Sequence, residues 1–302
     1  PEVPSTGMVV VDEEQFRSLP ASIATARAYR ALALDDLPAA VKHARQALKL
    51  ASEQDHLRHT QATALLGLAQ YASGDLEGAE RSLVDFQANM RKTGDILTAI
   101  GIAFLLADIR MALGRPREAE STYQQALQLA ASQGEPMPIG TADLYRGMSE
   151  LYCEWRDLEA ATQYLLTSKK LGEQAALPGW QHRVCVAQAR ISQARSDLDG
   201  ALDLLDEAER QYIRAPLPDV RPVAALKARV WTRQGRLTEA LAWAREQGLS
   251  VDDDLSYLRE FEHVTLAMVL IARYKSDRAD GSIHEAMRLL ERLLQAAEAG
   301  GR

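Results

Sequence analysis

The amino-acid sequence predicts an all-α protein, a right-handed superhelical solenoid of about seven helix-turn-helix repeats. One short pattern recurs seven times: a polar or glycine-containing turn, then an alanine, then a small or apolar residue seven positions later. The anchor alanines of the seven copies are Ala40, Ala79, Ala119, Ala161, Ala201, Ala240 and Ala286. Successive anchors lie 39, 40, 42, 40, 39 and 46 residues apart. A near-constant period of this size is typical of stacked units, each too small to bury its apolar face alone.

Each repeat is expected to contain two helices. Ala40 and Ala47 lie two helical turns apart, as do Ala119 and Ala126, so each pair shares one face that a neighbouring helix can approach closely. Upstream of the turns lie further segments with helical periodicity: Ala62–Tyr71, Ile100–Leu113, Leu144–Trp155, Val184–Ala194 and Val223–Gln234. The sequence shows no strand-like alternation of useful length, so no sheet is expected.

Turn residues mark where these helices end and begin. Three glycines follow first helices, where a left-handed residue is favoured: Gly74, Gly114 and Gly235. Four aspartates precede second helices, where a carboxylate can accept hydrogen bonds from free backbone N–H groups: Asp36, Asp75, Asp157 and Asp197. Pro38 and Pro116 are expected in a first helical turn, which does not use the N–H group that proline lacks.

Composition restricts the class of protein. The chain has 302 residues, a net charge of −7 and a pI of about 5.5, which disfavours nonspecific binding to nucleic acid. No apolar run reaches the length of a membrane span. Cys153 and Cys185 are far apart in sequence and are expected to be reduced thiols, as in a cytoplasmic protein.

The repeat pattern predicts a single domain over residues 1–302, with residues 1–11 as a linker or strap. Prolines mark three loops, at Glu135–Gly140, Ala176–Trp180 and Ala215–Pro222. A final helix is expected over His284–Ala299. Its apolar stripe of Ile283, Met287, Leu290 and Leu294 either packs inward or continues into a further domain.

Several segments resemble one known family. They are LYCEWRDLEAA (Leu151–Ala161), the turns SGDLEGAE and LGRPREAE, and LREFEHVTLAMVLIA (Leu258–Ala272). With these segments the chain resembles the tetratricopeptide-like sensor domain of the large ATP-dependent LuxR-type transcription regulators, the MalT-like family. The resemblance covers nearly the whole chain. Met268 stands where the family is expected to have arginine.

The resemblance implies that the chain is a fragment of a multidomain regulator. In that family an N-terminal NTPase hydrolyses ATP, the helical repeats sense an inducer, and a C-terminal helix-turn-helix binds DNA. The expected partners are therefore a small-molecule inducer or a regulatory protein, the other domains, and further copies of the full-length protein. This chain contains neither a G-x-x-x-x-G-K-[ST] phosphate loop nor a basic recognition helix, so no cofactor and no direct nucleic-acid contact are expected. The alternative is a stand-alone scaffold that binds peptides or proteins in its concave groove.

Candidate site residues follow from the repeat register. First helices are expected to line the groove, and the position eleven residues before the anchor alanine holds Asp108, Glu150, Arg190 and Arg229 in repeats three to six. One turn further on lie Glu154 and Arg233, and Arg146 and His182 are expected at the groove edge. Trp180, expected in a loop, is the candidate aromatic contact to a ligand.

Two interpretations of these charges stay open. They either form a ladder of exposed ion pairs between repeats, which contributes little to stability, or bind a polar ligand or peptide, because arginine makes bidentate contacts to carboxylate, phosphate or hydroxyl groups. No catalytic set is recognisable, so an enzyme is not expected. His56 and His59 lack the further ligands that a metal site needs.

Overall fold

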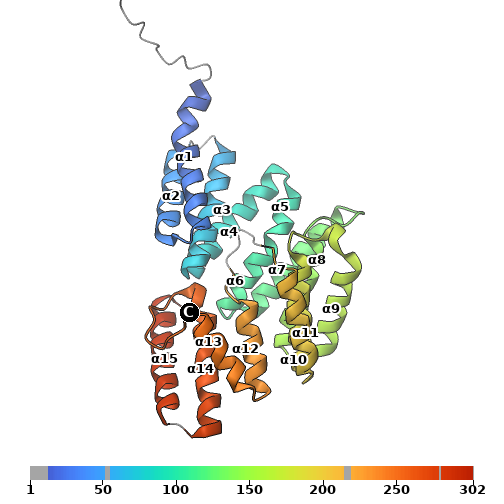
Figure 1. The fold of residues 1–302 in the computed structure, drawn as a ribbon. Coiled ribbons are helices and arrows are strands. Elements are labelled where there is room, and N and C mark those ends of the chain that lie inside the picture. The colour runs from blue at the N-terminus through green and yellow to red at the C-terminus, as the bar shows by residue number, and fades with distance from the viewer. Residues whose placement is uncertain (1–12, 52–54, 214–218, 279, 302) are drawn as a thin grey trace, which may run out of the picture.

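The computed structural model describes residues 13–51, 55–213, 219–278 and 280–301. These residues form fifteen α-helices, one short 3-10 helix and no strand, arranged as seven successive helical pairs (Figure 1). The first helices of the pairs are α1 (Glu13–Ala33), α3 (His56–Ser73), α5 (Ile96–Gly101) with α6 (Ala103–Ala112), α8 (Thr141–Glu154), α10 (Trp180–Ala194), α12 (Val223–Arg233) and α14 (Tyr257–Asp277). The second helices are α2 (Leu37–Leu50), α4 (Leu76–Thr93), α7 (Pro116–Ser132), α9 (Leu158–Leu171), α11 (Leu198–Arg210), α13 (Leu237–Glu246) and α15 (Asp280–Ala299). The predicted all-helical repeat architecture is confirmed.

The predicted turn residues occupy the predicted places. Gly74, Gly114 and Gly235 have φ angles of 85°, 71° and 76°, in the left-handed region at the ends of first helices. The four predicted aspartate caps each accept a hydrogen bond from the backbone N–H three residues on: Asp36, Asp75, Asp157 and Asp197. Asp55 and Asp95 cap α3 and α5 in the same way. Both prolines lie in first helical turns.

The anchor alanines are the points of closest packing between helices. All seven are at most 1% exposed. Glycine serves the same purpose where α7 meets α8, since a Cβ atom at Gly147 would overlap the ring of Tyr123. Buried apolar side chains gather in clusters along the stack, and half-buried residues such as Tyr152 and Phe261 pack against two clusters each. The core therefore continues from unit to unit, as expected for a solenoid.

The third unit departs from the predicted regularity. Its first helix, expected to be continuous over Ile100–Leu113, breaks at Ile102 into α5 and α6. The loop before α8 packs closely there, because a Cβ atom at Gly140 would lie 3.2 Å from the Cα atom of Gly101. Gly140 has a φ of 96°, which favours glycine.

The stack curves until its second and seventh units touch. Tyr257 at the start of α14 packs edge-on against Tyr71 of α3, with ring centroids 5.9 Å apart, and Figure 1 shows α14 and α15 close to the N-terminal helices. The connection between α11 and α12 enters this curve, since Val220 packs against the core of the second to fourth units. The described segment Asp219–Pro222 of this connection therefore reaches into the arc at Val220.

The structure excludes one of the two alternatives for the last helix. The apolar stripe of α15 does not pack inward: Met287, Leu290 and Leu294 are exposed, while Ala286 and Leu289 pack the helix on its neighbour. The predicted linker or strap, residues 1–11, lies outside the described residues. Both cysteines are free thiols. Among the described helices, none is long and apolar enough to cross a membrane.

Candidate functional site

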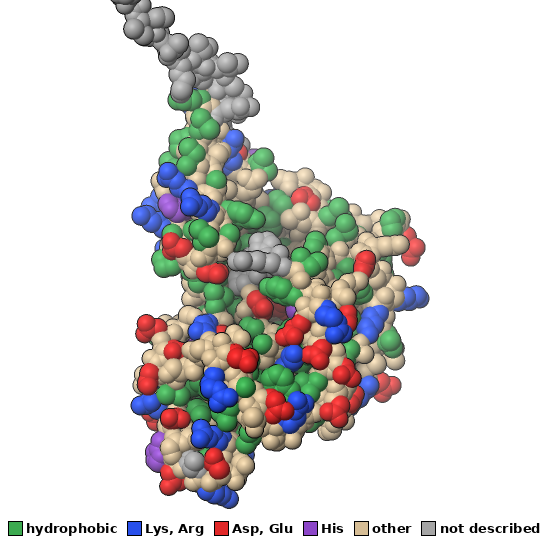
Figure 2. All heavy atoms as spheres, viewed as in Figure 1, with side chains coloured by type: hydrophobic (Ala, Val, Ile, Leu, Met, Phe, Trp, Pro, Cys, Tyr) green, Lys and Arg blue, Asp and Glu red, His purple; other side chains and the backbone are tan. Residues whose placement is uncertain are grey.

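The first helices of the units face a shared interior. Arg221, at the end of the α11–α12 connection, lies within electrostatic range of one residue in each of four first helices: Tyr71, Asp108, Glu150 and Arg229. We call this interior the concave groove. Figure 2 shows this face of the molecule hollowed at its centre, with charged side chains of both signs on the C-terminal side of the hollow.

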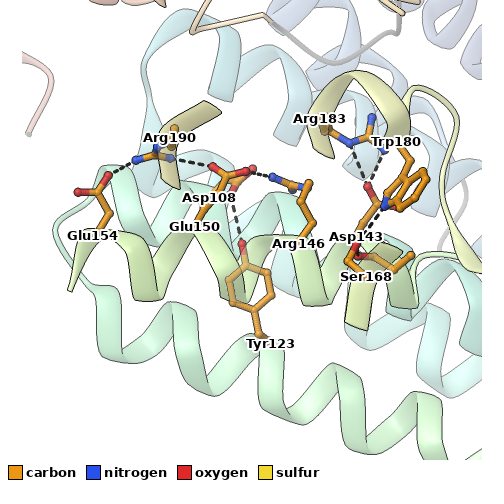
Figure 3. Close-up of polar contacts among 11 residues, drawn as sticks. Asp108, Tyr123, Asp143, Arg146, Glu150, Glu154, Ser168, Trp180, Arg183 and Arg190 are labelled. Carbon is orange, nitrogen blue, oxygen red and sulfur yellow. Dashed lines mark hydrogen bonds and ion pairs between the residues drawn. The ribbon is translucent and has the colours of Figure 1, made fainter. Parts of the chain in front are cut away.

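The repeat register brings an arginine of α10 beside two glutamates of α8. Arg190 donates from Nη1 to Glu150 Oε2 at 2.8 Å and from Nη2 to Glu154 (Figure 3). The side chain of Arg190 is 20% exposed. The expected adjacency of these residues is therefore present, but Arg190 is not the exposed charge that the sequence interpretation assumes.

Glu150 links Arg190 to a second, buried arginine. Arg146, one turn earlier on α8, pairs with the other oxygen of Glu150, and its side chain is 5% exposed. Arg146 was expected at the groove edge. The structure instead buries it, with its guanidinium 5.9 Å from the centre of the Phe104 ring. Two of its nitrogens, Nε and Nη2, have no hydrogen-bond partner among the described residues.

The pKa directions show how the network is balanced. Burial acts to raise the pKa of Glu150, but the charges of Arg146 and Arg190 outweigh it, so the pKa of this carboxyl is lowered. Burial raises the pKa of Asp108, which accepts a hydrogen bond of 3.3 Å from the Tyr123 hydroxyl. Opposite charges thus largely neutralise one another in this part of the groove.

A second ion pair holds the loop before α10. Asp143 is fully buried and accepts hydrogen bonds from Arg183 Nη2 at 2.6 Å and from the backbone N–H of Leu177 at 2.8 Å. Arg183 also lies over Phe104, at 5.7 Å from the ring centre. Register could have identified this pair, because its two residues are 40 positions apart in sequence.

The expectation for Trp180 is wrong. This residue does not lie in a loop but begins α10, and it is 9% exposed. Its indole N–H donates to Ser168 Oγ at 3.1 Å, and Ser168 donates in turn to the carbonyl of Ala142 (Figure 3). The ring packs in the core between α8, α9 and α10, so it offers a ligand almost no surface.

His182 and Arg233 each make a hydrogen bond to the backbone of another helix in the stack. His182 Nδ1 donates to the carbonyl of Ala208 at 2.8 Å, and its ring meets the edge of Tyr212. Arg233 donates from Nη2 to the carbonyl of Gln193 at 3.2 Å. Arg233 thus turns toward the preceding unit.

Arg229 differs from the other groove arginines. Its guanidinium lies 3.7 Å from the centre of the Phe261 ring, and its Nε donates to Thr265 Oγ1 at 2.8 Å. No described carboxylate pairs with it. Burial, with the charges of Arg221 and Arg190, lowers the pKa of Arg229 to about 10.

The N-terminal part of the fold adds an apolar hollow of about 440 Å³. It lies where α3, α4 and α5 meet the loops before α8 and α10. Its lining includes Leu68, Phe86, Leu97, Ile139 and Leu177. Cavities of this size and character accept small apolar groups. Sequence reasoning missed this hollow because the break between α5 and α6, which shapes it, left no periodic signal.

Comparison with known proteins identifies the family of repeats. A family model described as the MalT-like TPR (tetratricopeptide-repeat) region matches residues 21–302. No curated protein matches the chain.

Solved structures show the same type of fold. A tetratricopeptide repeat protein from Parabacteroides merdae superposes with a TM-score of 0.52 at 16% identity, covering 94% of this chain and 100% of its own. The apo form of RapI gives 0.57 at 12% identity, over 89% and 87%. A chain of the Cut9–Hcn1 complex gives 0.54 at 13% identity, over 93% of this chain and 54% of its own. At these identities the likeness extends to the fold alone.

Proposed function

We propose, because the chain belongs to the MalT-like tetratricopeptide-repeat family, that it is the sensing arm of a bacterial LuxR-type transcription regulator. In this role it binds a small-molecule inducer or a regulatory protein in its concave groove. ATP hydrolysis and DNA binding would be carried out by other domains of the regulator. The arm itself would act without catalysis in the cytoplasm, and self-association would belong to the intact protein.

The observation that carries the proposal is the match of the family model to residues 21–302, nearly the whole chain. The fold is consistent with it, because it offers fixed charges in the groove and an apolar hollow where α3, α4 and α5 meet the loops before α8 and α10. Ligand sites commonly combine an apolar lining with a few positioned polar groups.

The mechanism we propose is conformational. The arc brings α3 and α14 together at Tyr71 and Tyr257, and this contact is small compared with the contacts between successive units. A ligand that binds one curvature of the stack more tightly shifts the population toward that curvature. The shift would then reach the neighbouring domains through the ends of the stack.

A second candidate function is a scaffold that binds a peptide or protein without sensing a small molecule. The apolar hollow supports it, because exposed Leu97 and Ile139 at its lining could accept apolar side chains of an extended partner. The tetratricopeptide-repeat fold is compatible with both functions.

A thermal-shift screen of the chain against neutral sugars, organic acids and nucleotides tests the proposal. A specific ligand raises the melting temperature in a saturable way, since it binds the folded state only. Arg236→Gln, outside the groove and paired with Glu239 at 2.7 Å, should leave the shift unchanged. A chain that no small molecule stabilises, but that binds a defined peptide, would contradict sensing of a small inducer and support the scaffold function.

A further inference from the structure

Arg229 is held in place before any ligand binds. Its Nε donates to Thr265 Oγ1 at 2.8 Å, and its guanidinium carbon lies over the Phe261 ring, 3.7 Å from the ring centre. Thr265 is itself buried and donates to the carbonyl of Phe261 at 2.7 Å. Both supports come from α14, in the unit that follows Arg229. The guanidinium is therefore positioned by its neighbours and loses little further freedom on binding.

The two terminal nitrogens of Arg229 have no acceptor among the described residues. The groove carboxylates of α8 and the carboxylate beside Phe261 on α14 are paired with other arginines. Glu150 and Glu154 both pair with Arg190, and Glu262, next to Phe261 on α14, accepts from Arg259 Nε at 2.9 Å. A half-buried guanidinium usually has an anionic partner, because burial of an unpaired charge is unfavourable.

The surroundings of Arg229 add positive charge. Arg221 and Arg190 both lie near enough for their charges to act on it. Arg221 comes from the Asp219–Pro222 segment and is exposed. An anion placed between Arg229 and Arg221 would offset this repulsion. It would also meet the free edge of the Arg229 guanidinium, which fits the two oxygens of one carboxylate or phosphate.

We infer that Arg229 is the binding point for the anionic group, a carboxylate or a phosphate, of a small-molecule ligand in the C-terminal half of the concave groove. This inference rests on the proposed function, since it names the chemical class of the ligand that the groove takes. Arg221 adds long-range attraction, and Phe261 and Thr265 position the guanidinium. The paired arginines Arg146 and Arg190 are not part of this subsite.

Calorimetric titration of the chain with inorganic phosphate and, separately, with succinate at low ionic strength tests the inference. The wild-type chain should bind at least one of them saturably, and the preferred one identifies phosphate or carboxylate as the recognised group. Arg229→Gln should weaken binding about tenfold or more, which corresponds to about 1.4 kcal/mol. Arg229→Lys keeps the charge but loses the fork, so it should weaken binding less than Arg229→Gln.

Two controls keep the outcome interpretable. Arg236→Gln removes one positive charge seven positions away and should bind as the wild type does, which excludes a general loss of attraction. Circular dichroism of each variant reports whether it folds. Absence of anion binding by the wild type, or equal binding by Arg229→Gln, would overturn the inference. A neutral inducer that still stabilises Arg229→Gln would overturn this subsite while leaving the sensing function intact. Anion binding that depends on Arg229, without any inducer response in the intact regulator, would support this subsite and overturn the sensing function.

Discussion

Arg190 and Arg229 occupy the same position in successive repeats, yet the structure uses them differently. Arg190 faces Glu150 and Glu154 of the preceding unit and pairs with both. Glu150, Arg190 and Arg229 occupy equivalent positions of α8, α10 and α12. Arg190 therefore follows a repeat with a glutamate at this position, whereas Arg229 follows a repeat with an arginine, whose charge acts on it. Each repeat of a solenoid contacts only its neighbours, so Arg190 and Arg229 meet different charges because the repeats before them differ. One arginine is therefore part of the scaffold, and its equivalent is free for a ligand.

The pKa directions reflect this difference. Burial acts to lower the pKa of Arg190, but Glu150 and Glu154 outweigh it, so the pKa is raised. Burial lowers the pKa of Arg229 to about 10, and the like charges of Arg221 and Arg190 add to the effect. The folded state therefore stabilises the charge of Arg190 and disfavours the charge of Arg229. We define the paired half of the groove as Asp108, Arg146, Glu150, Glu154 and Arg190, and the unpaired half as Arg221 and Arg229.

The largest expected effect is on the buried member of the paired half. Arg146→Met should lower the free energy of unfolding by about 3–5 kcal/mol, because it leaves Asp108 and Glu150 with less compensation in a buried site. Chemical denaturation followed by circular dichroism measures the change. Arg236→Gln is the matched control, since it removes an exposed arginine. An Arg146→Met chain as stable as the wild type would show that the unpaired Nε and Nη2 atoms already cancel the benefit of the ion pair.

A smaller loss is expected for Arg190→Gln. The sequence alone predicts an exposed arginine here, with an effect below about 1 kcal/mol. Since the side chain is 20% exposed and holds two glutamates, we expect a loss of about 1–3 kcal/mol instead. A double-mutant cycle with Glu150→Gln isolates the pair, and a coupling energy near zero would contradict the structural role.

Much of this fold could be predicted from the sequence. Alanine spacing, glycine and aspartate at the turns, and proline in first turns are local signals that each repeat supplies again, so errors in one repeat are corrected by the others. The repeat register also predicts that Glu150 lies beside Arg190, and the ion pair between them confirms it. The same register also shows that Arg229 follows a repeat with an arginine at this position instead of a glutamate. The sequence interpretation missed this difference because it considered the groove arginines as one group.

Other features could not be predicted, because they depend on segments outside the repeat pattern. Arg221 reaches the groove from a connection, and no period assigns its position. Trp180 was expected in a loop because it follows proline and glycine, but burial of its ring starts α10 at that residue. The break at Ile102 depends on how closely the loop around Gly140 approaches, which is a tertiary contact.

Asp108 gives a pH-dependent difference within the paired half. Burial raises its pKa above the ordinary value of 3.8, so the ionised form is less favourable in the folded than in the unfolded state. The protonated Asp108 carboxyl therefore contributes to the stability of the folded state. This contribution is fully present below pH 3.8 and is lost as the pH rises through the raised pKa. Asp108→Asn cannot ionise and should be more stable than the wild type near neutral pH, with the difference shrinking toward acid. Thermal melts across this range measure it. A variant less stable at neutral pH would mean that attraction to Arg146 outweighs burial.

The smallest effect is expected for Arg229→Gln without ligand. The variant loses the contact with Phe261 and the hydrogen bond to Thr265, each worth about 1 kcal/mol. It also removes a buried charge that Arg221 and Arg190 repel, which acts in the opposite direction. We therefore expect a change within about 0.5 kcal/mol of zero, as for substitutions without structural cost. Melting temperatures with and without phosphate sharpen the comparison, because the anion should stabilise the wild type and Arg190→Gln but not Arg229→Gln. A loss for Arg229→Gln as large as that for Arg190→Gln would place both arginines in the scaffold and remove the distinction between the two halves of the groove.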